Sequence, residues 1–600
     1  MNMRFLVRWL SAVIMAVVIC PTVAMAQYDL YVEVTKPGTL EELVYDISET
    51  AMQDVQSMQV LGHINGKDMM FLREMCGVKG TSTPTEGKLK TLDLSFTSIV
   101  GSDDVYITVN GVNYTTHDDE FGPFFLYHCT NLESLELPNE IISIDTMALA
   151  ACTNLRHVEI PEIVQKIGYG AFVGCDNILR LVVPDEVSEI EVGAFQQMKR
   201  LNELVLGDRV REIDNSLILN DDSLEYIYLG VDFEKFNPVV FYTANALKAI
   251  HASIGSSIYS SEDGVLFSIT GDTLVTFPKA SEFVDYKIPD GVKRISPYAF
   301  YGADKLKSVT MPENLVCIDS LAFFGCKALE NVALNEKLDT IAFGAFGCGW
   351  GDEYALNTLK IPASVRCIEG GAFILNSSLE NIMIDQENTH YVVGEKGIIY
   401  NNDITAVCHV PCFAEDVALP ESVTDVGNYA FAGAMNTPFL SIGDNVKRIG
   451  DGAFAFATGL RELFLGKGVE KVGDMVVSYC DNLSSLYFFP KNIDDDNIAE
   501  YAFLDESGMV MEQCTLFVPE GLSELYLTKK GFYSEEFETF FFADIMEMLN
   551  ADRIQYVTGK GIEGSEPRYY NANGQQLQSQ SKGLNIITMP DGKSMKRFVK

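Results

Sequence analysis

The stretch Cys129-Thr-Asn-Leu-Glu-Ser-Leu-Glu-Leu-Pro138 recurs along the chain at a regular interval of about 23 residues. Self-similarity at a constant period of this size indicates a solenoid, in which each copy covers the apolar side of the copy before it. A length of 600 residues would ordinarily suggest about four domains, but the repeat favours one continuous stack. With the leucine of Thr-Asn-Leu taken as an anchor, the unbroken series is Leu132, Leu155, Ile178, Leu201, Leu224 and Leu247.

Each copy contains one short strand. In the segment 155–160, Val158 and Ile160 alternate with His157 and Glu159, which is the period of two that a half-buried strand requires. The length of the period is within the range of leucine-rich repeats. Since a copy of this length leaves no room for a long helix, we expect short 3₁₀ or irregular turns on the convex side.

A second anchor follows each strand, an Ala-Phe pair whose phenylalanine we expect to fill the middle of the coil. Gly170 precedes the pair in one copy and allows a tight corner there. The eight pairs are Ala171-Phe172, Ala194-Phe195, Ala299-Phe300, Ala322-Phe323, Ala345-Phe346, Ala372-Phe373, Ala430-Phe431 and Ala453-Phe454.

Two insertions interrupt the count and resemble each other. One begins at Tyr259 and ends at Pro278, and the other begins at Tyr391 and ends at Pro411. Each predicts a strand pair, a β-hairpin projecting from the coil.

The ends of the chain do not repeat, and a solenoid must cover its apolar ends. We therefore predict an N-terminal cap over 27–88, the repeat solenoid over 89–513, and a C-terminal cap over 514–556. Both caps are expected to be helical, with a helix from about Leu40 to Gln59, a second short helix ending near Met75, and a closing helix between Gly521 and Leu549. Residues 557–600 predict a short β tail with an Asn-Gly turn.

The first 26 residues form a secretory signal, with Arg4 and Arg8 before an apolar run and Ala24-Met-Ala26 as the cleavage site. Cleavage after Ala26 predicts an extracellular or outer-surface protein. The net charge of −40 argues against nucleic acid or an anionic membrane surface as the partner. No later stretch has the roughly 18 uninterrupted apolar residues of a membrane span.

Five cysteines recur at one position of the repeat, and we do not expect them to form disulfides with each other. A slot three residues before the anchor holds Cys129, Cys152, Cys175, Cys326 and Cys480. Side chains in neighbouring copies point the same way at ~4.8 Å, whereas a disulfide needs converging Cβ atoms ~3.8 Å apart, so we expect these cysteines to pack as small apolar residues. Cys408-His409 with Cys412 could form a metal clip, but without a second pair packing is the better interpretation.

The Cys-Thr-Asn-Leu, Leu-Pro or Ile-Pro, Ile-Gly and Gly-Ala-Phe elements at this step resemble the BspA-like, or treponemal-type, leucine-rich repeats over residues 89 to 518. The family resemblance implies a surface or secreted protein, several relatives being adhesins for host matrix proteins or other bacteria. The tail is similar to the sorting signals of the type IX secretion system at Tyr570-Asn-Ala-Asn-Gly574, Lys582-Gly-Leu584 and Val599-Lys600. That resemblance implies secretion machinery as a further partner.

Outward strand residues form a continuous face, expected to be the concave one, which changes from acidic to aromatic along the chain. Exposed aromatic residues on a rigid face are typical contact anchors, although tyrosine and phenylalanine also suit strands for structural reasons. We take Tyr226 and Tyr228 as the main anchors for a protein or glycan ligand, host extracellular matrix included. The full candidate set is Val205, Tyr226, Tyr228, His251, Phe439, Phe464 and Tyr487.

Catalytic signatures are missing from the sequence. It holds no His-Glu-x-x-His, no Gly-x-Ser-x-Gly and no phosphate-binding glycine loop. Acidic runs such as Asp494-Asp-Asp496 lack the ligand spacing of a calcium loop. We therefore predict no enzyme, no cofactor and no metal, and two classes stay open: a binding module, and a structural envelope protein with no soluble ligand.

Overall fold

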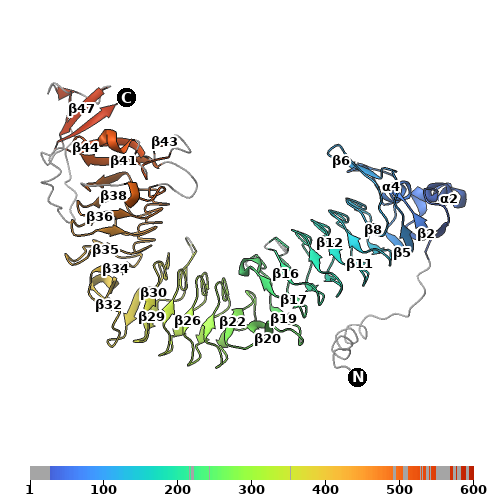
Figure 1. Cartoon of the computed structure of the whole chain (residues 1–600), viewed down its shortest axis with the longest axis horizontal. Helices are drawn as coiled ribbons and strands as arrows, with labels where there is room; N and C mark the ends of the chain where they lie inside the picture. Colours follow the sequence, from blue (N-terminus) through green and yellow to red (C-terminus); the bar gives the residue numbers. More distant parts are fainter. Residues whose placement is uncertain are drawn as a thin grey trace. The chain divides into compact units, whose positions relative to one another are not determined.

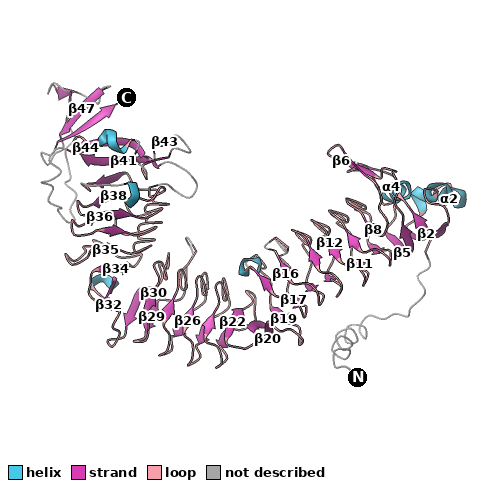
Figure 2. Cartoon of the chain, in the orientation of Figure 1, coloured by secondary structure: helices cyan, strands magenta, loops and turns pink. Residues whose placement is uncertain are grey.

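A computed structural model describes residues 28–599 apart from 215, 218–221, 242, 350, 352, 491–494, 504–510, 528, 530, 535–538, 541, 549–567, 572–575, 578–582 and 589–593. The chain divides into two compact units, one of residues 1–246 with 252–257 and one of 247–251 with 258–600. Strands and turns make up most of both (Figure 2). The leucine-rich-repeat solenoid predicted from the sequence period is confirmed.

The N-terminal cap is part helix and part sheet, and its strands continue the sheet of the solenoid. Helix α4 (Gly66–Met75) starts at a capping box formed by Asn65 and Asp68. The predicted helix to Gln59 is wrong at its end, because β2 (Ser57–Ile64) pairs in parallel with β5 (Thr91–Ile99). The other elements of the cap are β1 (Leu30–Val34), α2 (Leu40–Ile47), α3 (Ala51–Asp54), β3 (Val78–Lys79) and β4 (Thr83–Pro84).

Each later coil, here called a rung, contributes to two ladders of parallel strands (Figure 1). Ser134 of one rung lies opposite His157 of the next, one period further along the chain, as the repeat predicts. In the first unit the first ladder holds β9 (Ser134–Glu136), β11 (His157–Glu159), β13 (Arg180–Val182), β15 (Glu203–Val205) and β17 (Tyr226–Leu229). The second ladder holds β8 (Glu120–Phe121), β10 (Ser143–Ile144), β12 (Lys166–Ile167), β14 (Glu189–Ile190), β16 (Glu212–Ile213) and β18 (Lys235–Phe236). A hairpin, β6 (Ile107–Val109) with β7 (Val112–Tyr114), precedes them, and η1 (Pro238–Phe241) is a 3₁₀ turn.

The anchors predicted from the repeat are the core. All six leucine or isoleucine anchors from Leu132 to Leu247 are buried, and so are the phenylalanines of all eight Ala-Phe pairs. In the second unit these rings stack from rung to rung, with 4.6 Å between the centroids of Phe300 and Phe323. Stacked aromatic rings therefore fill the coil, as expected.

The corner before each Ala-Phe pair needs a left-handed backbone. Gly170 meets this need with φ 58°, and Tyr298 holds the same position with φ 59°. A glycine takes this conformation without steric cost, whereas a residue with a side chain does not. The amide of Phe172 then donates to the carbonyl of Ala194 at 2.9 Å, so the corners also bond from rung to rung.

Each insertion is an antiparallel strand pair, as predicted, but neither projects from the coil as predicted. The third strand that follows each pair joins the second ladder, so the insertion lies at the edge of that sheet. The first insertion is β20 (Tyr259–Glu262), β21 (Val265–Ser268) and β22 (Thr273–Thr276), continued by β24 (Arg294–Ile295), β26 (Cys317–Ile318), β28 (Thr340–Ile341) and β30 (Cys367–Ile368). The matching strands of the first ladder are β23 (Asp285–Lys287), β25 (Ser308–Thr310), β27 (Asn331–Ala333), β29 (Thr358–Ile361) and β31 (Asn381–Ile384).

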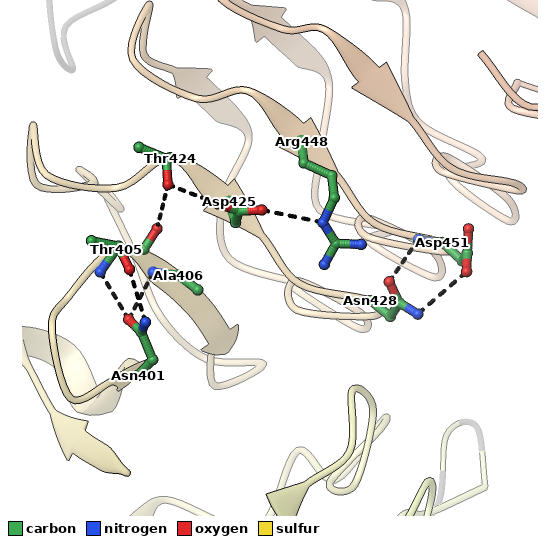
Figure 3. A network of polar contacts seen from close by, with 8 residues as sticks. All are labelled: Asn401, Thr405, Ala406, Thr424, Asp425, Asn428, Arg448 and Asp451. Carbon is green, nitrogen blue, oxygen red and sulfur yellow. Dashed lines mark hydrogen bonds and ion pairs between the residues drawn. The ribbon is translucent and has the colours of Figure 1, made fainter. Parts of the chain in front are cut away.

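Polar contacts bind the second insertion to its ladder (Figure 3). Asn401 Oδ1 accepts from the amides of Thr405 and Ala406, both at 2.8 Å, which closes the turn. On the next rung, Thr424 Oγ1 donates to the carbonyl of Thr405 at 3.3 Å, and Asp425 beside it accepts from Arg448 of the following rung at 3.2 Å. The strands are β32 (Tyr391–Val393), β33 (Ile399–Asn401), β34 (Ala406–His409), β35 (Asp425–Val426), β37 (Arg448–Ile449) and β39 (Lys471–Val472), with the 3₁₀ turn η2 (Glu395–Gly397).

The C-terminal cap is mostly strand, so the predicted closing helix is wrong. Only α5 (Ser523–Tyr526) is helical among its described residues. Phe517 and Met546 lie opposite each other because β44 (Phe542–Met548) pairs in parallel with β41 (Met511–Pro519) and extends the first ladder. That ladder also holds β36 (Phe439–Ile442), β38 (Glu462–Leu465) and β40 (Ser485–Phe488). The 3₁₀ turn η3 (Asp495–Asn497) comes before the cap, and the cap also contains β42 (Tyr533–Ser534) and β43 (Thr539–Phe540).

Strands in the tail continue this sheet. β48 (Ser594–Val599) pairs antiparallel with β44, and β47 (Gly583–Thr588) pairs with β48. β45 (Arg568–Asn571) and β46 (Gln576–Leu577) follow outward in the same sheet. The predicted Asn573-Gly574 turn and the signal segment lie outside the described residues.

Candidate functional site

In the first unit, the structure brings together three of the predicted site residues. Tyr228 lies opposite Val205, and Tyr226 lies opposite Glu203 on the same strand pair. All three candidates are half-buried on the outward side of the first ladder, because strand residues alternate between core and solvent. We call Val182, Val205, Tyr226 and Tyr228 the tyrosine patch.

A charged pair borders the tyrosine patch. Arg180 Nε donates to Glu203 at 2.8 Å, and this row, which continues to Tyr226, is two residues along the strands from the row of Val182, Val205 and Tyr228. Burial, and after it the charge of Glu203, raises the pKa of Tyr228, so its phenol stays protonated at neutral pH. The patch is an apolar row with a neutral phenol and a polar edge, the composition of a protein contact site.

In the second unit, four aromatic residues at outward strand positions form a stack, here called the aromatic ladder. Phe439, Phe464 and Tyr487 are half-buried, and Phe517 is buried. The ring centroids of Phe464 and Tyr487 are 3.8 Å apart, and those of Tyr487 and Phe517 are 4.5 Å apart. Phe439 packs against Phe464 at 5.0 Å with a tilt of 47°. The planes of Phe464, Tyr487 and Phe517 are within 12° of parallel, so these three rings cover each other's faces.

His251 lies on β19 (Ala249–Ala252), the strand next to β17 in the sheet that carries the tyrosine patch. Its side chain is half-buried, and it lies on a different sheet from the aromatic ladder.

Three carboxylates form an acidic row nearer the N-terminus, at the acidic end predicted for the outward face. Asp93 lies opposite Glu136, and Glu136 lies opposite Glu159. Asp93 accepts hydrogen bonds from Tyr28 at 2.9 Å and from Gln59 at 2.5 Å. Burial and the charges of Glu159 and Asp93 raise the pKa of Glu136.

Two members of these groups were left out of the predicted site. Val182 has 40% of its surface exposed and lies opposite Val205, and Phe517 extends the aromatic ladder as a buried ring. Both could have been found from the sequence. The alternation Thr515-Leu-Phe517 matches Ser485-Leu-Tyr487, which puts Phe517 in the outward position.

The described residues include no group of three or more histidine, cysteine or acidic side chains placed to hold a metal ion. Around the possible metal clip, burial raises the pKa of Cys408 to about 11 and that of Cys412 to about 12, and it lowers that of His409 to about 4. Asp494 lies outside the described residues.

Parallel ladders, a short regular rung and leucine anchors define a leucine-rich-repeat solenoid. A model of the BspA type leucine rich repeat region matches in six copies, over residues 119–248, 275–396 and 402–510. The chain belongs to the BspA-type leucine-rich repeat family. This confirms the resemblance seen in the sequence.

Solved bacterial structures are similar at low identity. A leucine-rich repeat protein from Eubacterium ventriosum is 18% identical, covering 64% of this chain and 84% of that chain with a TM-score of 0.37. A leucine rich cell surface protein from Faecalibacterium prausnitzii is 22% identical, covering 57% and 85% with a TM-score of 0.35. The pneumococcal vaccine antigen PcpA is 18% identical, covering 70% and 84% with a TM-score of 0.33. No curated protein matches the chain, and no helix among the described residues has the length and apolar character to cross a membrane.

Proposed function

We propose that this protein is a secreted or surface-displayed binding module, an adhesin that uses the outward face of the first ladder to hold a ligand. The observation that carries the proposal is the tyrosine patch, in which neighbouring strands align apolar and aromatic side chains beside a charged pair. Rigid aromatic anchors with a polar rim supply most of the energy of protein recognition.

The class of ligand can be inferred from whether the faces of the aromatic rings are open or covered. A sugar binds an aromatic side chain through an open ring face, and the rings of the aromatic ladder cover each other's faces. A protein ligand is therefore favoured over a glycan at the aromatic ladder, whereas the tyrosine patch is suited to either.

Export to the surface is part of the same proposal. Residues 1–26 have the pattern of a cleaved secretory signal, and the tail resembles a type IX sorting signal that would engage the secretion machinery. Removing residues 557–600 is expected to leave the protein inside the cell envelope. Detection of the truncated chain at the cell surface in normal amount would refute the role of the tail.

Binding is tested with immobilised host matrix proteins and mucin. The purified protein is compared with the double variant Tyr226→Ala and Tyr228→Ala, and we expect at least a tenfold loss of binding. The matched control is Ile163→Ala with Tyr169→Ala, because both residues are exposed apolar side chains outside the ladder strands of the same unit. Equal binding by the folded double variant would contradict the proposal.

The alternative, a structural envelope protein, predicts surface retention with no captured ligand. The aromatic ladder offers a second test, since Ser441 lies opposite Phe464 and can be changed without removing a ring. Ser441→Lys adds a charge beside the aromatic ladder and should weaken a protein ligand only if that ligand contacts it. If no matrix or mucin component binds the wild-type protein, the structural alternative is favoured.

A further inference from the structure

Cysteine thiols in the regular rungs bond to backbone carbonyls of the rung before. Cys152 Sγ donates to the carbonyl of Leu126 at 3.0 Å, and Cys175 Sγ to that of Leu149 at 3.2 Å. Cys326 and Cys480 repeat the contact. Each acceptor lies 26 residues earlier, so the thiol depends on a regular preceding rung.

Cys129 is the first cysteine of this column and has no regular rung before it. The equivalent earlier position is Asp103, which lies in the loop before β6. The hydrogen-bond partner of Cys129 is instead the thiol of Cys76, directly after α4. Both thiols are buried, with 1% or less of their surface exposed, and they form a hydrogen bond with each other.

Arg73 fixes the approach of the two cysteines. Its Nη1 donates to the carbonyls of Phe124 at 2.9 Å and Phe125 at 3.0 Å, and its Nη2 donates to Gly80. These bonds hold the end of α4 against the turn that carries Cys129. Cys76 and Cys129 thus come from different elements, whereas cysteines in neighbouring rungs are parallel copies whose side chains do not converge.

The hydrogen bond between the two thiols separates their pKa values, whereas the charge of Arg73 lowers both. Burial alone would raise the pKa of the Cys129 thiol, but the hydrogen bond from Cys76 and the charge of Arg73 lower it. The hydrogen bond with Cys129 and burial raise the pKa of Cys76. Since the thiolate is the attacking species in disulfide exchange, Cys129 reacts first.

We propose that Cys76 and Cys129 are a disulfide site, which locks the N-terminal cap to the first regular rung when the chain meets a small-molecule disulfide or a disulfide-bonded oxidoreductase. Both are thiols in this structure. The Cys129 thiolate attacks one sulfur of the oxidant and releases one thiol. Cys76 then loses its proton and attacks the Cys129 sulfur of the mixed disulfide, which releases the second thiol. The protein loses two electrons and two protons, and the oxidant gains them.

The test refolds the purified full chain from reductant and denaturant in a buffer of glutathione and glutathione disulfide, so that the thiols meet the oxidant before they are buried. Remaining thiols are blocked with N-ethylmaleimide, and the chain is cut with trypsin and Glu-C. Trypsin alone leaves Cys129 and Cys152 together in peptide 91–156, and cleavage at Glu133 separates them. We expect peptide 75–79 joined to peptide 121–133, and two fewer maleimide adducts than in a chain refolded with reductant.

Cys129→Ser should abolish the joined peptide, whereas Cys152→Ser, the matched buried cysteine one rung on, should keep it. Cys76→Ser gives the same test from the other side if Cys129→Ser does not fold. Hydrogen exchange in α4 should be slower in the oxidised chain than in the reduced chain. Maleimide on both Cys76 and Cys129 in a natively folded, oxidant-treated chain would overturn the proposal, as would Cys76 joined to Cys152.

Discussion

The rings of Phe464 and Tyr487 lie parallel on neighbouring strands, with their centroids 3.8 Å apart and 5° between their planes. Tyr487 stacks on its other side against Phe517. Each such pair contributes about 0.5–1.5 kcal/mol beyond area burial, so Tyr487→Ala should lower the local free energy of unfolding by roughly 1–3 kcal/mol. Hydrogen exchange of the strand amides in 462–488 measures this loss.

Tyr487→Phe is the matched control, because it keeps the stacked ring and removes only the hydroxyl. Its exchange rates should stay close to those of the wild-type protein. Faster exchange in both variants would mean that the hydroxyl, and not the stack, stabilises these rungs.

Phe172 is a fully buried plug in the first unit, and its ring contacts that of Phe195. Phe172→Ala should cost ~3–5 kcal/mol, as the deletion of a core aromatic ring does. In a stack where each rung contacts only its neighbours, the loss should act locally. Limited proteolysis should show new cleavage near residue 172, while Tyr169→Ala, an exposed residue close by, should not produce it.

The fold of the rungs could be predicted because the recurring apolar positions of the repeat identify the core residues. Leu155 and Phe172 recur in equivalent positions, and one burial pattern then accounts for every copy. The tyrosine patch could be predicted for the same reason, since strand alternation fixes which side chains of β15 and β17 face outward.

The ends could not be predicted in this way, because their strands are decided by partners far along the chain. Leu40 to Gln59 has helical spacing, yet Met58 pairs with Leu92 of the solenoid and takes the extended form. Met546 likewise becomes strand because Phe517 lies beside it. Spacing also gives no ring orientation, so the covered faces of Phe464 and Tyr487 were not foreseen.

Arg294 forms two hydrogen bonds to Asp319 on the next rung, Nε to Oδ2 at 2.5 Å and Nη2 to Oδ1 at 2.6 Å. The side chain of Asp319 is 9% exposed, so its charge depends on this partner. Arg294→Ala should cost about 1–3 kcal/mol, the range for a hydrogen-bonded charge.

The matched control for Arg294 is Arg180→Ala. Arg180 pairs with Glu203, whose side chain is 28% exposed, and exposed pairs contribute ~0–1 kcal/mol. Urea denaturation of both variants compares the two costs. A larger loss at Arg180 than at Arg294 would contradict the argument from burial.

His409 should make the second insertion sensitive to acid. The imidazole is buried against the ring of Phe373, 5.2 Å away, and burial lowers its pKa from 6.5 to about 4. Between these values the unfolded chain binds a proton that the folded chain does not. The stabilisation is therefore complete above about pH 6.5 and is lost as pH falls towards 4, by about 3 kcal/mol in total.

Hydrogen exchange over residues 399–409 at pH 7 and pH 4.5 should show most of this loss in the wild-type protein. His409→Leu removes the proton site while carboxylates titrate as before, so its loss between the two pH values should be smaller by about 2–3 kcal/mol. Equal losses in the two proteins would show that carboxylates, and not His409, set the acid sensitivity of this insertion.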